Sequence, residues 1–439
     1  MTEETTKTEH SKPKSMGAPS AAAENAAPYP DMALGQRVHR LSDPPTLLEE
    51  IGTTVKNAYL YRHVVQKIKD QGLQIPSNVL SEDQLKALEA THSEKLEELE
   101  KAVEDAGENA GDMEVLDARI SVARYCAQCL DPTTALGAYQ KVMDLPKLST
   151  GKKMDALMES ARLAFFYKLQ GPNESPDHFI DLAEKLSEKG GGDWDRRNRL
   201  KVYRALAKLW HRDTVGASPL LLEGMATFSC NELCSYSDFL VYAMLANLLH
   251  LERPKVHEKI LQGPEILAVQ LEIPNVVRVA EYRYHWNTCF STHWLTWQCQ
   301  IRFCLQIKLV KSLYDCEYKT YLHCLVDLEE LLRGDRFLAP HVSYWLRELH
   351  ILAYHQFLES YSSVQLTAMA AALGVSVEFL DYHASRYIAA GRLSAKIDKY
   401  GGVIRTSRPD ATNAQYREVI QKGDLLLNRI QTLARVVDL

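Results

Sequence analysis

The sequence predicts an all-α chain in which paired helices stack as a solenoid, followed by a small module of three helices with a β-hairpin and by one long terminal helix. Three observations predict this order. Related helix pairs recur between Asp112 and Leu267, with a spacing of about forty residues. The helical period of apolar residues gives way to strict alternation only near Leu393. From residue 411 onward, apolar residues follow spacings of four and three.

The first 44 residues are rich in Ala, Pro, Ser, Thr and charged residues, with almost no bulky apolar side chain before Leu34. Because such a segment cannot bury enough apolar surface to offset its chain entropy, we expect disorder over 1–44. Within 45–110, helices are expected at 46–70 and 82–106. The second carries a narrow apolar stripe among many charges, so we interpret it as a solvated helix leaning on its neighbour rather than a dimeric coiled coil.

Residues 111–340 are expected to form a helical solenoid. Segments beginning at Ala123, Ala161 and Val202 look related, because each contains an apolar helix, a polar turn and a second amphipathic helix. Tetratricopeptide-like repeats of this kind bury their apolar faces against neighbouring repeats. No long hydrophobic strand is indicated before Leu393, so a parallel sheet is not expected.

Three helices are predicted within residues 341–410. The first two share an apolar face with residues three or four apart, interrupted at Ser362 and Ser363 and ended by Gly374, a residue suited to a helix C-terminus. Ser376 is a suitable N-cap for the third helix, and Gly391 follows its last turn.

A β-hairpin follows the third helix. Leu393, Ala395 and Ile397 alternate with polar residues, Gly401-Gly402 supplies the turn and Val403 begins the return strand. Three helices and a hairpin form a winged helix. An exposed strand edge either pairs with another strand or must be protected, so these strand residues are candidate interface residues.

The charges on the third helix bear on nucleic-acid binding, a common role of winged helices. Glu378 and Asp381 outnumber the single basic residue Arg386, whereas a phosphate-binding face needs several Lys and Arg residues. The whole chain has a formal charge of −6. A protein-contact role is therefore the stronger hypothesis, and DNA binding the weaker one.

Three separated blocks of sequence match one family in order. They are GGDWDRRNRLKVYRAL from Gly191, LERPKVHEKILQGPEIL from Leu251, and the stretch from Glu359 to Tyr416 followed by GDLLLNRIQTLARVV. Over roughly residues 45–439 the chain resembles the PCI-domain subunits of the 26S proteasome lid, of the type called non-ATPase regulatory subunit seven, or regulatory subunit six in animals.

This resemblance implies a non-catalytic scaffold without cofactor that supports ubiquitin-dependent protein degradation in cytoplasm and nucleus. Its implied partners in a hetero-oligomer are other PCI subunits, the lid deubiquitinase and the ATPase base, with no nucleic acid and no membrane. The closest alternative is the homologous PCI subunit of the signalosome. A winged-helix nucleic-acid binder and an enzyme with an unrecognised site are further alternatives.

The sequence contains no phosphate-binding loop, nucleophile elbow or HExxH helix. Cys126 and Cys129 form a CxxC pair, but no second pair completes four zinc ligands, so we favour packing over a metal site. Nine Cys without a repeating framework fit a reducing compartment. The N-terminus lacks the apolar run of a signal peptide.

The last segment, 411–439, predicts an amphipathic helix that packs in a bundle. The alternative is that its apolar face folds back on the winged helix. A glycine in this face favours close approach of a partner helix. The face consists of Tyr416, Ile420, Gly423, Leu427, Ile430, Ala434 and Val437.

A basic run, with Arg196, Arg197 and Arg199, begins a helix in the first matching block. Basic residues there oppose the helix dipole and need acidic compensation, which Asp193 and Asp195 supply in part. Two interpretations stay open: an interface with an acidic partner helix, or an ion-pair network within the chain.

Between Arg278 and Leu309 the resemblance breaks. Residues 279–308 hold three of the six Trp and three of the nine Cys, with no Asp or Gly. Deleting them restores IPNVVRLVKSLYDCEYKTYL, a smooth continuation of the helix pattern. Since Val codons begin with GT and a Lys codon can end in AG, we hypothesise a retained intron translated in frame. A lineage-specific insertion with a binding role is the alternative.

Overall fold

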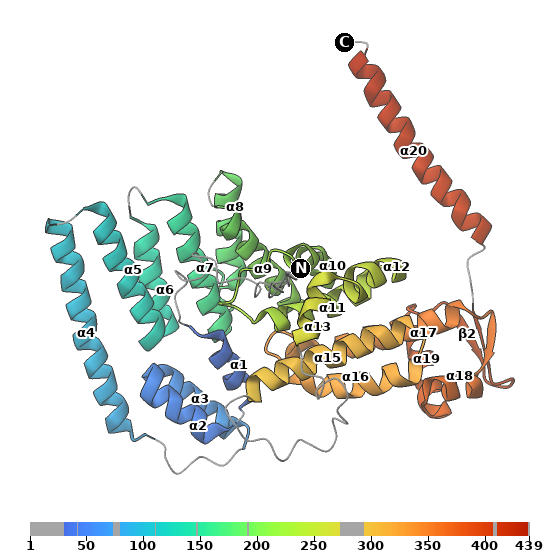
Figure 1. The fold of residues 1–439 in the computed structure, drawn as a ribbon, viewed down its shortest axis with the longest axis horizontal. Helices are drawn as coiled ribbons and strands as arrows, with labels where there is room; N and C mark the ends of the chain where they lie inside the picture. The colour runs from blue at the N-terminus through green and yellow to red at the C-terminus, as the bar shows by residue number, and fades with distance from the viewer. Residues whose placement is uncertain are drawn as a thin grey trace, which may run out of the picture. The chain divides into compact units, whose positions relative to one another are not determined.

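A computed structural model describes residues 30–41, 43–72, 80–109, 111–145, 148–190, 193–272, 294–406 and 411–437, with side chains outside the description at 271–272, 294–301 and 411–414. Figure 1 shows the helices and strands of the chain, which divides into two compact units. The first comprises residues up to Ile307 together with Leu328–Val342, and the second comprises Lys308–Asp327 and residues from Ser343 onward.

The first unit is helical throughout its described residues. Its elements are α1 (Met32–Arg40), α2 (Pro44–Glu50), the π-helix η1 (Ile51–Val55), α3 (Ala58–Asp70), α4 (Glu82–Asn109), α5 (Asp112–Cys129), α6 (Pro132–Met143), α7 (Thr150–Tyr167), α8 (Pro176–Glu188), α9 (Trp194–Trp210), α10 (Thr214–Gly224), α11 (Tyr236–His250), α12 (Arg253–Val256), the π-helix η2 (His257–Leu261), α13 (Pro264–Glu272), the 3₁₀-helix η3 (Ala339–His341), and parts of α15 (Trp294–Tyr314) and α16 (Tyr318–Arg333).

Helix α1 corrects the expectation of disorder over 1–44. Its residues Met32, Leu34 and Val38 are buried, and the Arg37 guanidinium donates to the Glu50 carboxylate at 2.6 Å. A composition average hides such a short apolar stripe, which is stable because it packs against other helices. The expectation is therefore wrong from residue 32 onward, and residues 1–29 lie outside the described part.

The single helix expected over 46–70 is three elements, α2, η1 and α3. Asn57 explains the last boundary: its side chain accepts a hydrogen bond from Leu60 N at 2.8 Å and so caps α3. The same amide donates to Gln128 O at 2.9 Å. An N-cap that also binds another helix end fixes where α3 starts.

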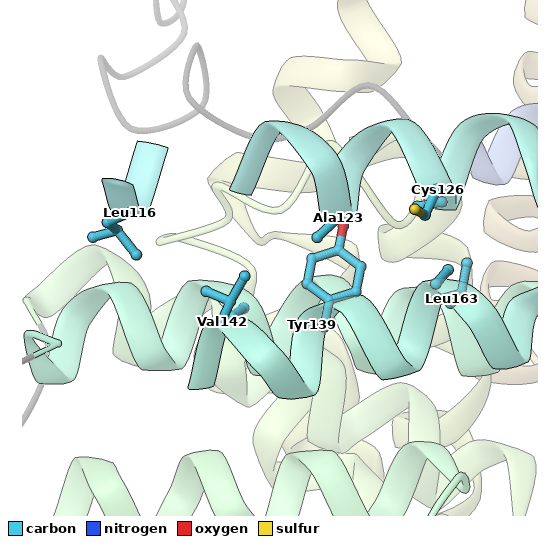
Figure 2. Packing of buried hydrophobic residues seen from close by; sticks show 9 residues of the cluster. Leu116, Ala123, Cys126, Tyr139, Val142 and Leu163 are labelled. Carbon is cyan, nitrogen blue, oxygen red and sulfur yellow. The ribbon is translucent and has the colours of Figure 1, made fainter. Parts of the chain in front are cut away.

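The predicted helix pairs are present as α5 with α6, α7 with α8, and α9 with α10, which confirms the solenoid. Figure 2 shows the core between the first three of these helices, where the Tyr139 ring of α6 extends toward Ala123 of α5. The Tyr139 hydroxyl donates to the Glu159 carboxylate at 2.9 Å, and Arg124 donates to the same carboxylate at 2.7 Å. This shared carboxylate ties α5, α6 and α7 together.

Helix α4 packs on α5, as the sequence interpretation proposed. Leu85 and His92 are its buried residues, and the remaining stripe is half-buried. The His92 ring contacts the Tyr125 hydroxyl and Lys56 O, both at 2.7 Å. These contacts hold a mostly charged helix against its neighbour.

The second unit contains the winged helix predicted for residues 341–410. Its elements are the rest of α15 and α16, α17 (Val342–Glu359), β1 (Ser363–Gln365), α18 (Leu366–Leu373), α19 (Val377–Ala389), β2 (Ala395–Asp398), β3 (Val403–Thr406) and α20 (Ala411–Val437).

The capping residues predicted from the sequence lie at the ends of α18 and α19. The Ser376 hydroxyl accepts from Phe379 N at 3.3 Å, which caps α19. Gly374 and Gly391 adopt φ values of 70° and 69°, the left-handed conformation that ends a helix.

The sheet differs from the expected hairpin. It has three strands in the order β1-β3-β2, and both neighbours pair with β3 in antiparallel register. Ser363, expected to interrupt a helix, begins the third strand, and Val364 lies opposite Ile404. The return strand is thus the centre of the sheet, with β1 and β2 at its edges.

Candidate interaction surfaces

The strand residues proposed for an interface divide into two groups. Leu393 and Ala395 are only 4% and 5% exposed, so their side chains belong to the core of the winged helix. Ile397 and Val403 are half-buried. Lys396 and Asp398 alternate with these residues and are exposed. A partner strand would therefore pair with a backbone edge rather than with these side chains, and β2 is the edge strand that carries Ala395 and Ile397.

The ladder of the sheet shows which β2 donor faces outward. Thr406 N donates to Ser362 O at 3.0 Å and Leu366 N to Gly402 O at 2.8 Å, so the even-numbered amides of β3 face β1. Arg405 and Val403 then pair with β2 through Lys396 and Asp398, their register partners. Because strand amides alternate in direction, the N–H of Ile397 points away from β3.

The other outward amide of β2 is that of Ala395, and it is already used. Ala395 N donates to Leu393 O at 3.0 Å. The Asp398 carboxylate accepts from Tyr400 N and Gly401 N, both at 3.1 Å, and closes the turn. Ile397 therefore supplies the outward donor of β2 that remains for a partner strand.

Helix α19, which reads DNA in many winged helices, has its charges engaged within the unit. Lys399 lies 3.1 Å from the Asp381 carboxylate. Arg386 donates to the Tyr382 hydroxyl at 3.3 Å and lies over its ring. Lys399 is thus paired with a carboxylate and Arg386 is stacked on a ring, which is unfavourable for a phosphate contact.

Helix α20 is exposed along its described side chains, 415–437. The predicted apolar face contains Tyr416, Ile420, Leu427, Ile430 and Val437, which are 56–75% exposed. Gly423 has nothing within 4 Å of the point where a Cβ would stand, and Ala434 is exposed. The large apolar side chains that α20 exposes are Tyr416, Val419, Ile420, Leu425, Leu426, Leu427, Ile430, Leu433, Val436 and Val437.

Sequence analysis missed one row of this face. Val419, Leu426 and Leu433 recur every seven residues and are 61–67% exposed. In a heptad that starts at Tyr416 they occupy the fourth position, and they flank the row of Tyr416 and Ile430 on the side away from Ile420 and Leu427. The complete face is thus three rows wide, broader than a two-helix coiled-coil seam and typical of a helix that packs against several others.

Three family models match consecutive parts of the chain. The model described as 26S proteasome subunit RPN7 matches residues 81–259, the PCI domain matches 302–408, and the C-terminal helix of 26S proteasome regulatory subunit RPN7/PSMD6 matches 415–437. The chain is 36% identical over 418 residues to the 26S proteasome non-ATPase regulatory subunit 6 homolog of Arabidopsis thaliana, covering 93% of this chain and 97% of that protein.

The chain belongs to the RPN7/PSMD6 family of 26S proteasome regulatory subunits.

Two further relatives support this assignment. The 26S proteasome regulatory subunit rpn7 of Schizosaccharomyces pombe is 33% identical over 419 residues, covering 93% of this chain and 96% of that protein. The RPN7 subunit of Saccharomyces cerevisiae is 31% identical over 347 residues, covering 79% and 73%. Within the RPN7/PSMD6 family, α20 corresponds to a named C-terminal helix and the winged helix to the PCI domain.

In this family member, two of the three predicted basic interface residues bind carboxylates of their own chain. Arg196 donates to both oxygens of Asp155 at 2.9 and 2.8 Å. Arg199 donates to Glu232 at 2.8 and 2.5 Å, and both side chains are buried. Arg197 is exposed, and no side-chain partner is described for it. Arg196 and Arg199 thus belong to an ion-pair network within the chain. Arg197 remains available to an acidic partner.

The charge of Glu232 affects the pKa of Arg199. Burial alone lowers the pKa of the Arg199 guanidinium, but the adjacent Glu232 carboxylate outweighs it and holds this pKa above its ordinary value. A pair with such geometry stabilises the fold only while both partners are present.

The CxxC pair is part of the solenoid core. Cys126 and Cys129 are buried free thiols of α5, and burial raises the pKa of Cys126 to about 11. Across the described residues, no group of three His, Cys, Asp or Glu side chains could hold a metal ion. In the same part of the chain, no helix combines the length and apolarity needed to cross a membrane.

Proposed function

We propose that this chain is a structural subunit of the proteasome lid, without catalysis of its own, that supports ubiquitin-dependent protein degradation. The observation that carries this proposal is the exposed three-row apolar face of α20. An exposed apolar surface of this extent on a soluble protein marks an interaction site. The relatives are named regulatory subunits of the 26S proteasome, which supplies the assembly in which the face is covered.

Two contacts with neighbouring subunits follow. The apolar face of α20 enters a bundle with C-terminal helices of other PCI subunits, and β2 pairs with a strand of a neighbouring winged helix through Ile397. Further partners are the lid deubiquitinase and the ATPase base, in cytoplasm and nucleus. The engaged charges of α19 favour this role over nucleic-acid binding.

Affinity purification of the tagged chain from its native source, with mass identification of partners, tests the assembly. Co-purification of lid and base subunits is expected. Recovery of signalosome subunits in their place would instead assign the homologous scaffold, and recovery of nucleic acid alone would contradict both. Truncation after Asp410 should abolish co-purification and leave the unfolding temperature unchanged, because α20 lies fully exposed on the described surface.

A substitution at Ile397 tests the proposed strand contact. Ile397→Pro removes the outward N–H without removing a bond to β3, which an edge strand tolerates. We expect reduced incorporation into the lid. Ile397→Ala is the matched control, because it loses similar side-chain contacts but keeps the donor. Equal incorporation of the two variants would refute strand pairing. Ala395→Pro is a poorer test, since Ala395 is buried and its amide already binds Leu393 O.

A further inference from the structure

The longest internal stretch that the family matches leave uncovered lies between the first two of them. The first long match ends at residue 259 and the PCI match begins at 302. Residues 279–308, whose composition sets them apart, overlap the end of this stretch and continue into α15. Residues 279–293 lie outside the described part, and side chains are described from Arg302 onward. The described residues of α15 show whether the side chains of this segment suit their buried surroundings.

Gln306 does not fit its site in α15. It is 1% exposed, and neither its amide nitrogen nor its carbonyl oxygen has a hydrogen-bond partner. The residues one turn away on the same helix face, Phe303 and Val310, are buried and apolar. Burying an amide without partners costs free energy, whereas an apolar residue of suitable size would gain it. The site is built for a hydrophobic side chain.

Removing thirty residues supplies that side chain. An excision of 277–306, 278–307 or 279–308 moves Val276 to the position of Gln306, because the upstream chain advances by thirty positions in each case. Pro274 then takes the position of Cys304. Proline is favoured at the first position of a helix, where its missing N–H would have no partner. Since α13 ends at Glu272, a short turn would join it directly to the shortened α15.

Arg302 is the residue in this stretch with the strongest contacts to the rest of the core. Its guanidinium lies 3.0 Å from Asp238 and 2.6 Å from Asp335. Asp335 keeps other donors without it: the Tyr242 hydroxyl at 2.8 Å and Phe337 N at 2.9 Å. Asp238 is partly exposed and can be hydrated. Hydrogen-bond donors favour the ionised form of a carboxylate. In the shortened chain Asp335 would keep these donors but lose its cationic partner.

The genetic code distinguishes the three possible windows, and it excludes 278–307 because no codon for Arg278 begins with GT. Introns begin with GT and end with AG, and donor sites prefer G as their fifth nucleotide. The window 277–306 opens with Val-Arg, which GTACGT encodes, and closes with Gln, one of whose codons is CAG, the commonest acceptor triplet. The window 279–308 opens with Val-Ala, whose codons place C at the fifth nucleotide, and closes with Lys. The first window satisfies both splice sites better.

We propose that residues 277–306 are the in-frame translation of a retained intron, and that the working subunit is thirty residues shorter, with Val276 followed directly by Ile307. The shorter chain has an apolar residue at the buried site and a proline at the helix start. It also has an uninterrupted α13–α15 connection. This proposal is independent of the assembly that the subunit joins.

Sequencing of the gene and of its mature transcripts tests the proposal directly. We expect GT at the start of the Val277 codon, AG at the end of the Gln306 codon, and most messages joining the Val276 codon to the Ile307 codon. A mature message that keeps the thirty codons as its main form would overturn the proposal. So would recovery, from the purified native protein, of peptides between Tyr284 and Arg302 in amounts equal to those of its other peptides.

Stability measurements test the structural argument separately. The chain lacking 277–306 should unfold at a higher temperature than the full chain, and Gln306→Val in the full chain should raise its unfolding temperature. Gln356→Val is the matched control, because the Gln356 amide donates to Leu313 O at 2.9 Å and its loss should lower that temperature. A shortened chain that is less stable than the full one would contradict the proposed fit.

Discussion

The basic run of α9 and the apolar face of α20 were both predicted as interfaces from the sequence. In the structure, most of the basic run binds its own chain, whereas the apolar face is exposed. The charges of Arg196 and Arg199 are met by carboxylates of the same chain. The apolar side chains of α20 remain exposed over its described length. Charged residues readily find partners within a fold, whereas an apolar face left uncovered requires another molecule. Uncovered apolar area is therefore the better indicator of an interface.

The largest effect on stability should come from substitution of Arg199, the buried residue of the basic run. Arg199→Ala leaves the Glu232 carboxylate buried without its partner, which should lower the free energy of unfolding by roughly 3–5 kcal/mol. Denaturant unfolding of the isolated chain measures this. Arg197→Ala, two residues away in an exposed position, serves as the control and should change stability by less than about 0.5 kcal/mol. Similar losses in both variants would remove the distinction between the two arginines.

The third row of α20 is a seven-residue repeat that the prediction overlooked, whereas the partners of the basic run could not be predicted from the sequence alone. Alternating spacings of four and three select two rows of the heptad and pass over Val419, Leu426 and Leu433. Asp155 and Glu232, the partners of Arg196 and Arg199, lie 41 and 33 residues away along the chain. Only tertiary packing brings them together, so a local charge pattern cannot distinguish the two interpretations.

Elements with local signals were predicted well, and elements defined by distant pairing were missed. Ser376, Gly374 and Gly391 mark helix ends through their own conformations, and the structure places the ends there. Strand β1 has three residues and exists because β3 pairs with it, so no periodicity marks it. Helix α1 is likewise stabilised by contacts such as that of Arg37 with Glu50.

A moderate, pH-dependent effect should come from His39 at the end of α1. Burial, with the nearby Lys168 and Lys67 ammonium groups, lowers the pKa of His39 to about 4 from an ordinary value of 6.5. Because the folded pKa is depressed, its contribution to stability is complete above pH 6.5 and declines as the pH falls toward 4.

His39→Gln should therefore make stability fall less steeply over that pH range. Thermal unfolding of the two proteins at a series of pH values measures the difference. The exposed His323→Gln variant is the control and should reproduce the slope of the unsubstituted chain. An unchanged slope for His39→Gln would contradict this assignment.

The smallest effect is expected at Arg197, the exposed arginine of the basic run. If it meets an acidic partner, Arg197→Glu should weaken incorporation by about 0.2–1 kcal/mol, the range of exposed ion pairs. The loss should shrink as salt concentration rises. Competition between tagged wild-type and variant chains at two salt concentrations measures this. A loss that is insensitive to salt would show that the contact is not electrostatic.

The central claim is that the apolar face of α20 is an assembly surface and contributes nothing to the fold of the isolated chain. The most direct measurement substitutes one outer row of this face, Val419→Asp with Leu426→Asp and Leu433→Asp, and records both unfolding temperature and incorporation into the lid. A control variant carries Gln421→Asp with Asn428→Asp on the opposite face. We predict an unchanged unfolding temperature with incorporation abolished in the first variant only. A chain that unfolds at a lower temperature, or that still assembles, would contradict the claim.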